Sequence, residues 1–219
     1  MKNTIEALIF DMDGILIDSE PLHLEAFKLL LSTFGHQYSE SYNRQFLGMK
    51  DTEITPQIIA DFKLKIQPDE FIEKKDWHFH ELIKKFGSPR AGVIETLKEA
   101  RSLGVKVGLA SSSKMDSIKL IVEVLKLKSY FDNLTSGEEV LRGKPEPDVF
   151  LLSAKRLLTD PHKCLVLEDS ENGVKAAKKA GMFVVAIPCP ATEHQEHLEA
   201  DFKLSSMTEL NLAPLVSTR

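Results

Sequence analysis

Short apolar runs alternate with amphipathic segments along most of this chain. Buried strands are predicted at residues 7–10, 105–110, 133–136, 164–167 and 183–187, with a last short strand near 202–204. Apolar residues recur every three or four positions between these runs, which predicts helices at residues 92–103, 118–125, 148–158 and 172–180. Strands that alternate with helices favour a parallel sheet joined by helical crossovers. We therefore expect an α/β fold.

The stretch from residue 18 to residue 87 breaks this alternation. A helical pattern begins after Ser19, a plausible N-cap, and is expected to end at Gly35. The same periodicity predicts helices near 51–62 and 69–86, and we find no convincing strand signal in the stretch. We expect a core formed by residues 1–17 and 88–219, interrupted by an all-helical insert at residues 18–87.

Composition narrows the class of protein. The chain has 219 residues, of which 42% are hydrophobic, and a formal net charge of −5. An ordered globular protein is expected, and the acidic balance argues against a nucleic-acid binder. Cys164 and Cys189 fit no metal-binding spacing and suit a reducing cytoplasm. We see no targeting segment and no run long enough to cross a bilayer, so no membrane partner is expected.

Polar residues follow three of the predicted strands. Asp11-Met12-Asp13-Gly14 follows the first, Ser111-Ser112-Ser113 the second and Glu168-Asp169 the fourth, with Gly143-Lys144-Pro145 between the last two. The carboxyl edge of a parallel sheet is where open α/β folds bind their ligands. Two carboxylates held close together need a cation or a shared proton. An Asp-Gly pair is also a common turn, so Asp11–Gly14 alone is ambiguous. The ordered set favours a phosphoryl-transfer site with Mg²⁺.

This set of motifs resembles the haloacid dehalogenase superfamily, in its phosphatase and phosphomutase branch, over nearly the whole chain. The matching segments are Asp11–Glu20, Ser111, Lys144–Asp148 and Glu168–Ser170. Dehalogenases proper lack the second aspartate, so the presence of Asp13 implies phosphoryl transfer. The resemblance implies a Rossmann-like parallel sheet core, an inserted helical cap that closes over the site, and Mg²⁺ as the cofactor.

The resemblance also implies roles for individual residues. Asp11 is expected to be the nucleophile that forms an aspartyl-phosphate, and Asp13 the acid that protonates the leaving oxygen and then activates water. Ser111 and Lys144 are expected to contact the phosphate, and Lys144 also to balance the charge of Asp11. The metal ligands are expected to be Asp11, the main-chain carbonyl of Asp13, and Asp169, with Glu168 as either a ligand or a support.

Several of these residues also have purely structural explanations. Glu168 and Asp169 stand before a helix that Ser170 can cap, where acidic residues are favourable. Ser112 is a candidate substrate-binding residue, and either Ser112 or Ser113 could serve as a helix N-cap. We interpret Asp148 as the N-cap of the next helix. His78 and His80 diverge on a helix, and His194 and His197 lie in a glutamate-rich stretch typical of a solvated surface.

Specificity is expected to come from the insert. The candidate substrate-binding residues there are His23, Gly48 and Lys50. Mutases that convert β-glucose phosphates resemble this chain up to the glycine, then have Ser-Arg where this chain has Lys50-Asp51. Their arginine grips a second phosphate, which Asp51 would repel unless Lys50 takes the place of the arginine. Gly143 before Lys144 is also similar to the phosphatase pattern.

We therefore expect a monomeric, cytoplasmic Mg²⁺-dependent phosphatase that acts on small phosphorylated metabolites such as sugar, polyol or nucleoside monophosphates. A sugar phosphomutase of the β-phosphoglucomutase type is the alternative. A non-catalytic binding protein on the same fold is a remote third hypothesis, since all four motifs are intact.

Overall fold

The computed structural model describes residues 5–47 and 49–216. The chain divides into two compact units. The sheet unit comprises the chain up to Asp18 and from Ser88 onward, and the helical unit comprises Ser19–Gly87.

The sheet unit is built on six parallel strands in the order β3-β2-β1-β4-β5-β6. They are β1 (Ala7–Phe10), β2 (Lys106–Ser111), β3 (Asn133–Ser136), β4 (Cys164–Glu168), β5 (Phe183–Ala186) and β6 (Phe202–Lys203). Strands β1 and β4 are buried along their whole length, which explains why they read as continuous apolar runs rather than alternating ones. The predicted α/β class with a Rossmann-like parallel sheet is confirmed.

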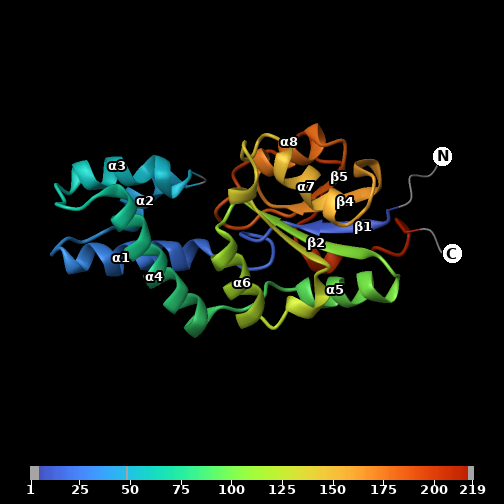
Figure 1. Ribbon diagram of the computed structural model, residues 1–219, viewed down its shortest axis with the longest axis horizontal. Helices are drawn as coiled ribbons and strands as arrows, with labels where there is room; N and C mark the ends of the chain where they lie inside the picture. The colour runs from blue at the N-terminus through green and yellow to red at the C-terminus, as the bar shows by residue number, and fades with distance from the viewer. Residues whose placement is uncertain (1–4, 48, 217–219) are drawn as a thin grey trace. The chain divides into compact units, whose positions relative to one another are not determined.

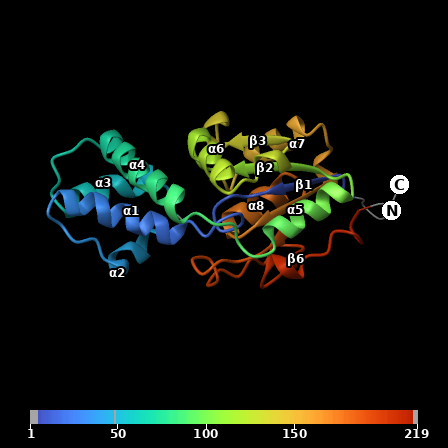
Figure 2. The same cartoon turned by 90° about the horizontal axis from the view of Figure 1, so that it is seen from below.

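Helices cover both faces of this sheet. Figure 1 shows α7 (Asp148–Arg156) and α8 (Glu171–Lys179) on one face, and α5 (Val93–Ser102) and α6 (Met115–Val124) on the other. Figure 2 gives the view with α5 in front of β1. From β1 to β3 the chain adds each new strand on one side of β1, and from β4 to β6 it adds each new strand on the other side. The order in which strands are added therefore reverses between β1 and β4. That reversal is the point at which parallel α/β sheets bind ligands.

Helix ends differ from the predicted ones where the first turn is polar. Helix α6 begins at Met115, three residues before the predicted start, and its N-cap is Lys114 rather than Ser112 or Ser113. Asp148 is the first residue of α7 and not its N-cap, which is Pro147. The apolar pattern misplaces these ends because it marks only the buried face. Ser170 does cap α8, since its hydroxyl accepts the N–H of Gly173 at 3.2 Å.

Every element that the structure describes in the helical unit is a helix. They are α1 (Glu20–Thr33), α2 (Glu40–Asn43), α3 (Asp51–Asp61) and α4 (Pro68–Phe86). Ser19 occupies the N-cap position of α1, as predicted. A hydrophobic core of aromatic and aliphatic residues, among them Phe27, Phe71 and Ile58, holds this unit together. Five short 3-10 helices complete the described elements: Arg44–Phe46, Lys128–Tyr130, Gly137–Glu139, Pro161–Lys163 and Met207–Glu209.

None of the helices in the described ranges combines the length and the apolar character that crossing a membrane requires.

Candidate active site

The polar strand ends meet because of the sheet register. Phe10 at the end of β1 pairs with Leu109 of β2 and with Leu167 of β4. The residues that follow the three strands therefore emerge at the same level of the carboxyl edge. The Asp11 N–H continues the ladder by donating to the Leu167 carbonyl at 3.0 Å. Local sequence thus sets which residues end each strand, and the register brings them together.

Lys144 links two of these strand ends. Its Nζ lies 2.7 Å from Asp11 Oδ1 and 2.6 Å from Glu168 Oε1, and its side chain is only 8% exposed. The ammonium also lies 4.8 Å from the centroid of the Phe150 ring. Burial alone would lower the pKa of Lys144, but Asp11 and Glu168 outweigh it and raise that pKa. The lysine is therefore held as a cation against the candidate nucleophile.

Three buried carboxyl groups surround this lysine. Oxygen atoms of Asp11, Glu168 and Asp169 lie within 4.8 Å of one another. Burial raises the pKa of Asp11 well above its usual value, with Lys144 opposing the shift and the neighbouring acids adding to it. Burial, and then Glu168, raise the pKa of Asp169 to about 7. One ammonium cannot neutralise three carboxylates, so the cluster fits a hard divalent cation that prefers oxygen ligands.

Glu168 is held from two sides. Its Oε1 accepts Lys144, and its Oε2 accepts the N–H of Ser170 at 2.7 Å and the Ser170 hydroxyl at 3.0 Å. Gly173 in α8 leaves room for it, because a Cβ there would lie 1.6 Å from Glu168 Oε1. These contacts hold the Glu168 carboxylate between Lys144 and the start of α8.

Asp169 packs against the turn after β1. Gly14 has a φ of +74°, and a Cβ on it would lie 2.1 Å from Asp169 Oδ2. Only glycine satisfies both the left-handed backbone and this close approach. Cys189 and Thr192, neither of which the sequence pattern had singled out as a site residue, donate hydrogen bonds to the same oxygen.

The serine run after β2 has three different environments. Ser111 is 1% exposed, and its hydroxyl accepts the N–H of Ser113 at 3.1 Å. Ser112 is exposed, and its backbone lies against Gly137. Ser113 donates from Oγ to Asp13 Oδ2 at 2.9 Å, so it orients the candidate acid–base, which the sequence alone did not reveal.

The candidate residues of the helical unit form a separate arrangement. Lys75, which is 1% exposed, lies 2.7 Å from Asp51 Oδ2 and 2.7 Å from His23 Nδ1. The His23 ring stacks on Phe79 with a centroid separation of 3.9 Å. Asp51 is therefore the counter-ion of a buried lysine, which the sequence analysis did not anticipate. Lys50 is exposed at the N-cap of α3, and Gly48 lies outside the described residues.

One of the two histidines that the sequence analysis assigned to the surface is buried. His197 was assigned to a solvated surface, but it is 3% exposed, and its Nε2 contacts the Asp169 main-chain oxygen. The glutamate-rich composition indicated a surface segment, but the chain folds back so that His197 reaches the residue that follows β4. His194 is exposed, as predicted.

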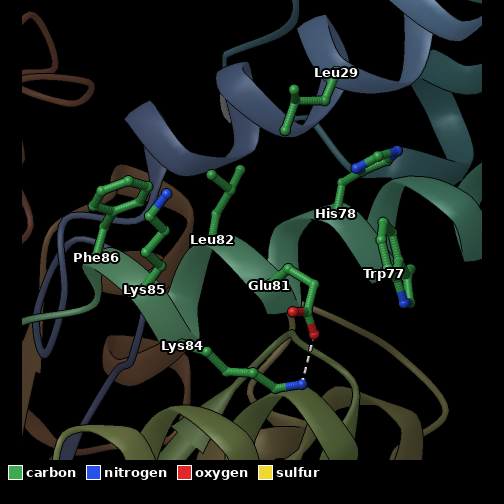
Figure 3. A pocket seen from close by; sticks show the side chains of 8 residues that line it. All are labelled: Leu29, Trp77, His78, Glu81, Leu82, Lys84, Lys85 and Phe86. Atoms are coloured by element: carbon green, nitrogen blue, oxygen red, sulfur yellow. Dashed lines mark hydrogen bonds and ion pairs between the residues drawn. The ribbon is translucent and has the colours of Figure 1, made fainter.

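A hollow of about 520 Å³ lies on the helical unit, between Leu29 of α1 and α4 (Figure 3). Its lining includes exposed Trp77 and Phe86 together with Lys84 and Lys85. Figure 3 shows the ion pair of Lys84 with Glu81 at its edge. None of the motif residues discussed above lines this hollow.

Comparisons with known proteins place the chain in a family. Residues 8–187 match the family model described as haloacid dehalogenase-like hydrolase. The chain is 37% identical over 182 residues to a phosphorylated carbohydrates phosphatase of Thermotoga maritima, covering 81% of this chain and 82% of the relative. It is 34% identical over 220 residues to hexitol phosphatase B of Escherichia coli, covering 97% of each.

Among solved structures, CbbY of Rhodobacter sphaeroides in complex with phosphate is similar, with a TM-score of 0.88 and 28% identity. The match covers 97% of this chain and 99% of that protein.

Proposed function

Because the chain belongs to the haloacid dehalogenase-like hydrolase family, we propose that it is a Mg²⁺-dependent phosphatase of small phosphorylated metabolites. The observation that carries the proposal is the position of Lys144, 2.7 Å from Asp11 and 2.6 Å from Glu168 at the carboxyl edge of the sheet. A buried carboxylate held by one cation beside two further acids suits nucleophilic attack on an anionic ester.

In the proposed reaction, a carboxylate oxygen of Asp11 attacks the phosphorus atom of a monoester and forms an aspartyl-phosphate. Asp13 protonates the leaving oxygen as its bond to phosphorus breaks. Asp13 then takes a proton from water, which attacks the same phosphorus, releases inorganic phosphate and restores the Asp11 carboxylate. Ser113 holds Asp13 for both transfers.

The other residues stabilise charge. Lys144 balances Asp11 and the phosphate oxygens, and Ser111 donates its hydroxyl hydrogen to the phosphate. Asp11, Asp169 and the main-chain carbonyl of Asp13 hold Mg²⁺, which when bound supplies positive charge that offsets the negative charge of the ester.

Hydrolysis, rather than transfer to a second position of the same sugar, is supported by Asp51. Its carboxylate accepts Lys75 at 2.7 Å, so a buried lysine of the helical unit is already paired with an acid. A mutase must retain a bisphosphorylated intermediate, which calls for a cationic grip on the second phosphate. The named phosphatases among the relatives support the same choice, and sugar, polyol and nucleoside monophosphates are the proposed substrate class.

The test is a screen of phosphorylated metabolites for Mg²⁺-dependent release of inorganic phosphate. Several five- and six-carbon monophosphates are expected to be hydrolysed without a bisphosphate activator. β-Glucose 1-phosphate with a trace of glucose 1,6-bisphosphate is the decisive substrate. Glucose 6-phosphate that accumulates much faster than free phosphate would establish the mutase instead, with Lys50 as the grip on the second phosphate.

A further inference from the structure

The segment from Cys189 to His197 encloses Asp169 and has no part in the reaction steps above. Cys189 Sγ and Thr192 Oγ1 each lie 3.1 Å from Asp169 Oδ2. Cys189, Thr192 and Asp169 are 4%, 8% and 6% exposed, so water does not compete strongly for these contacts. Two donors from one turn therefore end on a single carboxylate oxygen.

The hydrogen of the Thr192 hydroxyl has one favourable destination. Its oxygen accepts the Cys189 N–H at 3.0 Å, so the hydroxyl hydrogen must go elsewhere. The Cys189 carbonyl, 3.4 Å away, already accepts the N–H groups of Thr192 and Glu193 at 2.9 and 2.8 Å. A carbonyl oxygen has two lone pairs, which those two donors use. The Cys189 sulfur, 3.5 Å from the hydroxyl oxygen, is only a weak acceptor, so the hydroxyl hydrogen is directed to Asp169.

Asp169 is confined on its remaining sides as well. The Gly14 backbone lies so close to Oδ2 that a Cβ would collide with it, and His197 contacts the Asp169 main-chain oxygen. The carboxylate cannot rotate without breaking both hydrogen bonds. Because Oδ2 already accepts two donors, the other carboxylate oxygen is left to serve a cation.

We propose that Thr192 and Cys189 are positioning residues that orient the Asp169 carboxylate and thereby set the affinity of the site for its divalent cation. This inference rests on the cation site of the proposed function. Groups that orient a metal ligand typically change metal affinity by about 10–100-fold when they are removed.

The experiment is a calorimetric titration of the full-length protein with MgCl₂ in the absence of substrate. Thr192→Val removes the hydroxyl at nearly constant shape, and its Kd for Mg²⁺ is expected to rise about tenfold or more. Thr192→Ser keeps the hydroxyl and is expected to bind Mg²⁺ like the wild type. A role confined to stability predicts a lower melting temperature in EDTA but an unchanged Kd.

Thr192→Val also removes the acceptor of the Cys189 N–H and can loosen the turn. Cys189→Ala leaves that acceptor in place and removes only the thiol donor, so its Kd for Mg²⁺ is a second, independent test. Cys189→Ser keeps a donor at this position and is its matched control. A raised Kd in Cys189→Ala and in folded Thr192→Val, restored by both serine variants, supports the inference. An unchanged Kd in Cys189→Ala, a loss that serine does not restore, or a wild type that binds no Mg²⁺ overturns it.

Phosphate release measured in parallel separates the two proposals. If the variants show the expected Mg²⁺ affinities but the wild-type protein hydrolyses no ester, the proposed function is contradicted and the positioning role stands. Phosphate release that saturates at the same Mg²⁺ concentration in every variant contradicts only the positioning role.

Discussion

Asp11 is a buried carboxyl group that one lysine stabilises and three acids, Glu168, Asp169 and Asp13, repel. Asp11→Asn should reduce phosphate release to below about one per cent of the wild-type rate, because an amide of the same shape is no nucleophile. The melting temperature should hold or rise, since repulsion by Glu168 and Asp169 is relieved while Lys144 keeps its bond to Glu168. Hydrolysis of a chromogenic phosphate ester measures the rate, and thermal unfolding measures the melting temperature. Retained activity, in protein shown by mass not to have deamidated, would exclude Asp11 as the nucleophile.

Ser113 acts on the candidate acid–base through a single 2.9 Å hydrogen bond to Asp13. Ser113→Ala should lower kcat roughly tenfold, which is the effect of one hydrogen bond of about 1.4 kcal/mol in the transition state. Asp13→Ala should cost more, about 10²–10⁴-fold. Steady-state kinetics at saturating Mg²⁺ measure both, with Ser113→Thr as the variant that keeps a hydroxyl. A changed Mg²⁺ affinity with an unchanged kcat would instead place Ser113 at the metal site.

At the scale of elements, helix α8 approaches the end of β4 so closely that only glycine fits at position 173. Gly173→Ala would place a Cβ 1.6 Å from Glu168 Oε1, so the helix must move or Glu168 must give up its contacts. We expect the free energy of unfolding to fall by about 1–3 kcal/mol, as for other overpacked sites. Urea denaturation measures this loss. Lys175→Ala at a partly exposed position of the same helix is the control and should stay near the wild-type value.

Helices α3 and α4 are joined by the pair of Asp51 with buried Lys75. Asp51→Asn removes the charge that Lys75 faces at 2.7 Å, which should lower the free energy of unfolding by about 1–3 kcal/mol. Replacing both partners, as Asp51→Asn with Lys75→Met, should recover much of the loss because no buried charge is then left uncompensated. Chemical denaturation of the three proteins tests this. A double variant less stable than Asp51→Asn alone would mean that Lys75 contributes chiefly through Asp76, which lies 3.7 Å away, or through His23 and the aromatic neighbours.

At the scale of the whole molecule, the acidic cluster couples stability to pH and to Mg²⁺. Burial, and then Glu168, raise the pKa of Asp169 from 3.8 to about 7, so in EDTA its contribution is complete below about pH 4 and is lost as the pH rises through 7. Melting temperatures in EDTA should therefore fall between pH 5 and pH 8. Added Mg²⁺ binds the ionised form and should raise the melting temperature more at pH 8 than at pH 5.

Asp169→Asn is the control for that effect. The variant should show a flatter pH dependence in EDTA and little stabilisation by Mg²⁺, because one of the two carboxyl groups with a raised pKa, and with it a proposed ligand of the cation, is gone. A wild-type melting temperature that climbs steadily from pH 5 to pH 8 in EDTA would mean that the carboxyl groups of this cluster are ionised without a cation.

The strands, the crossover helices and the polar residues at the carboxyl ends of the strands could be predicted from the sequence, but the exact helix ends could not. Apolar runs and three- to four-residue periodicity are local signals, so β1, β2 and β4, the crossover helices, and Asp11, Ser111 and Glu168 at the strand ends could all be read from the chain. The Gly-Lys-Pro run marked Lys144 in the same way. Parallel strands share a carboxyl edge, so their meeting also followed from the sequence.

The contacts that hold these residues in place became visible only in the folded molecule. Asp51 faces Lys75 from another helix, Ser113 turns to Asp13, and Cys189, Thr192 and His197 close around Asp169. These partners are far apart in the chain and carry no periodic pattern. Their side chains are polar groups that are equally common in exposed turns, as the misassigned His197 illustrates. Burial decides their role, and burial depends on which segment folds back onto which strand, a property of the assembled molecule rather than of any local stretch.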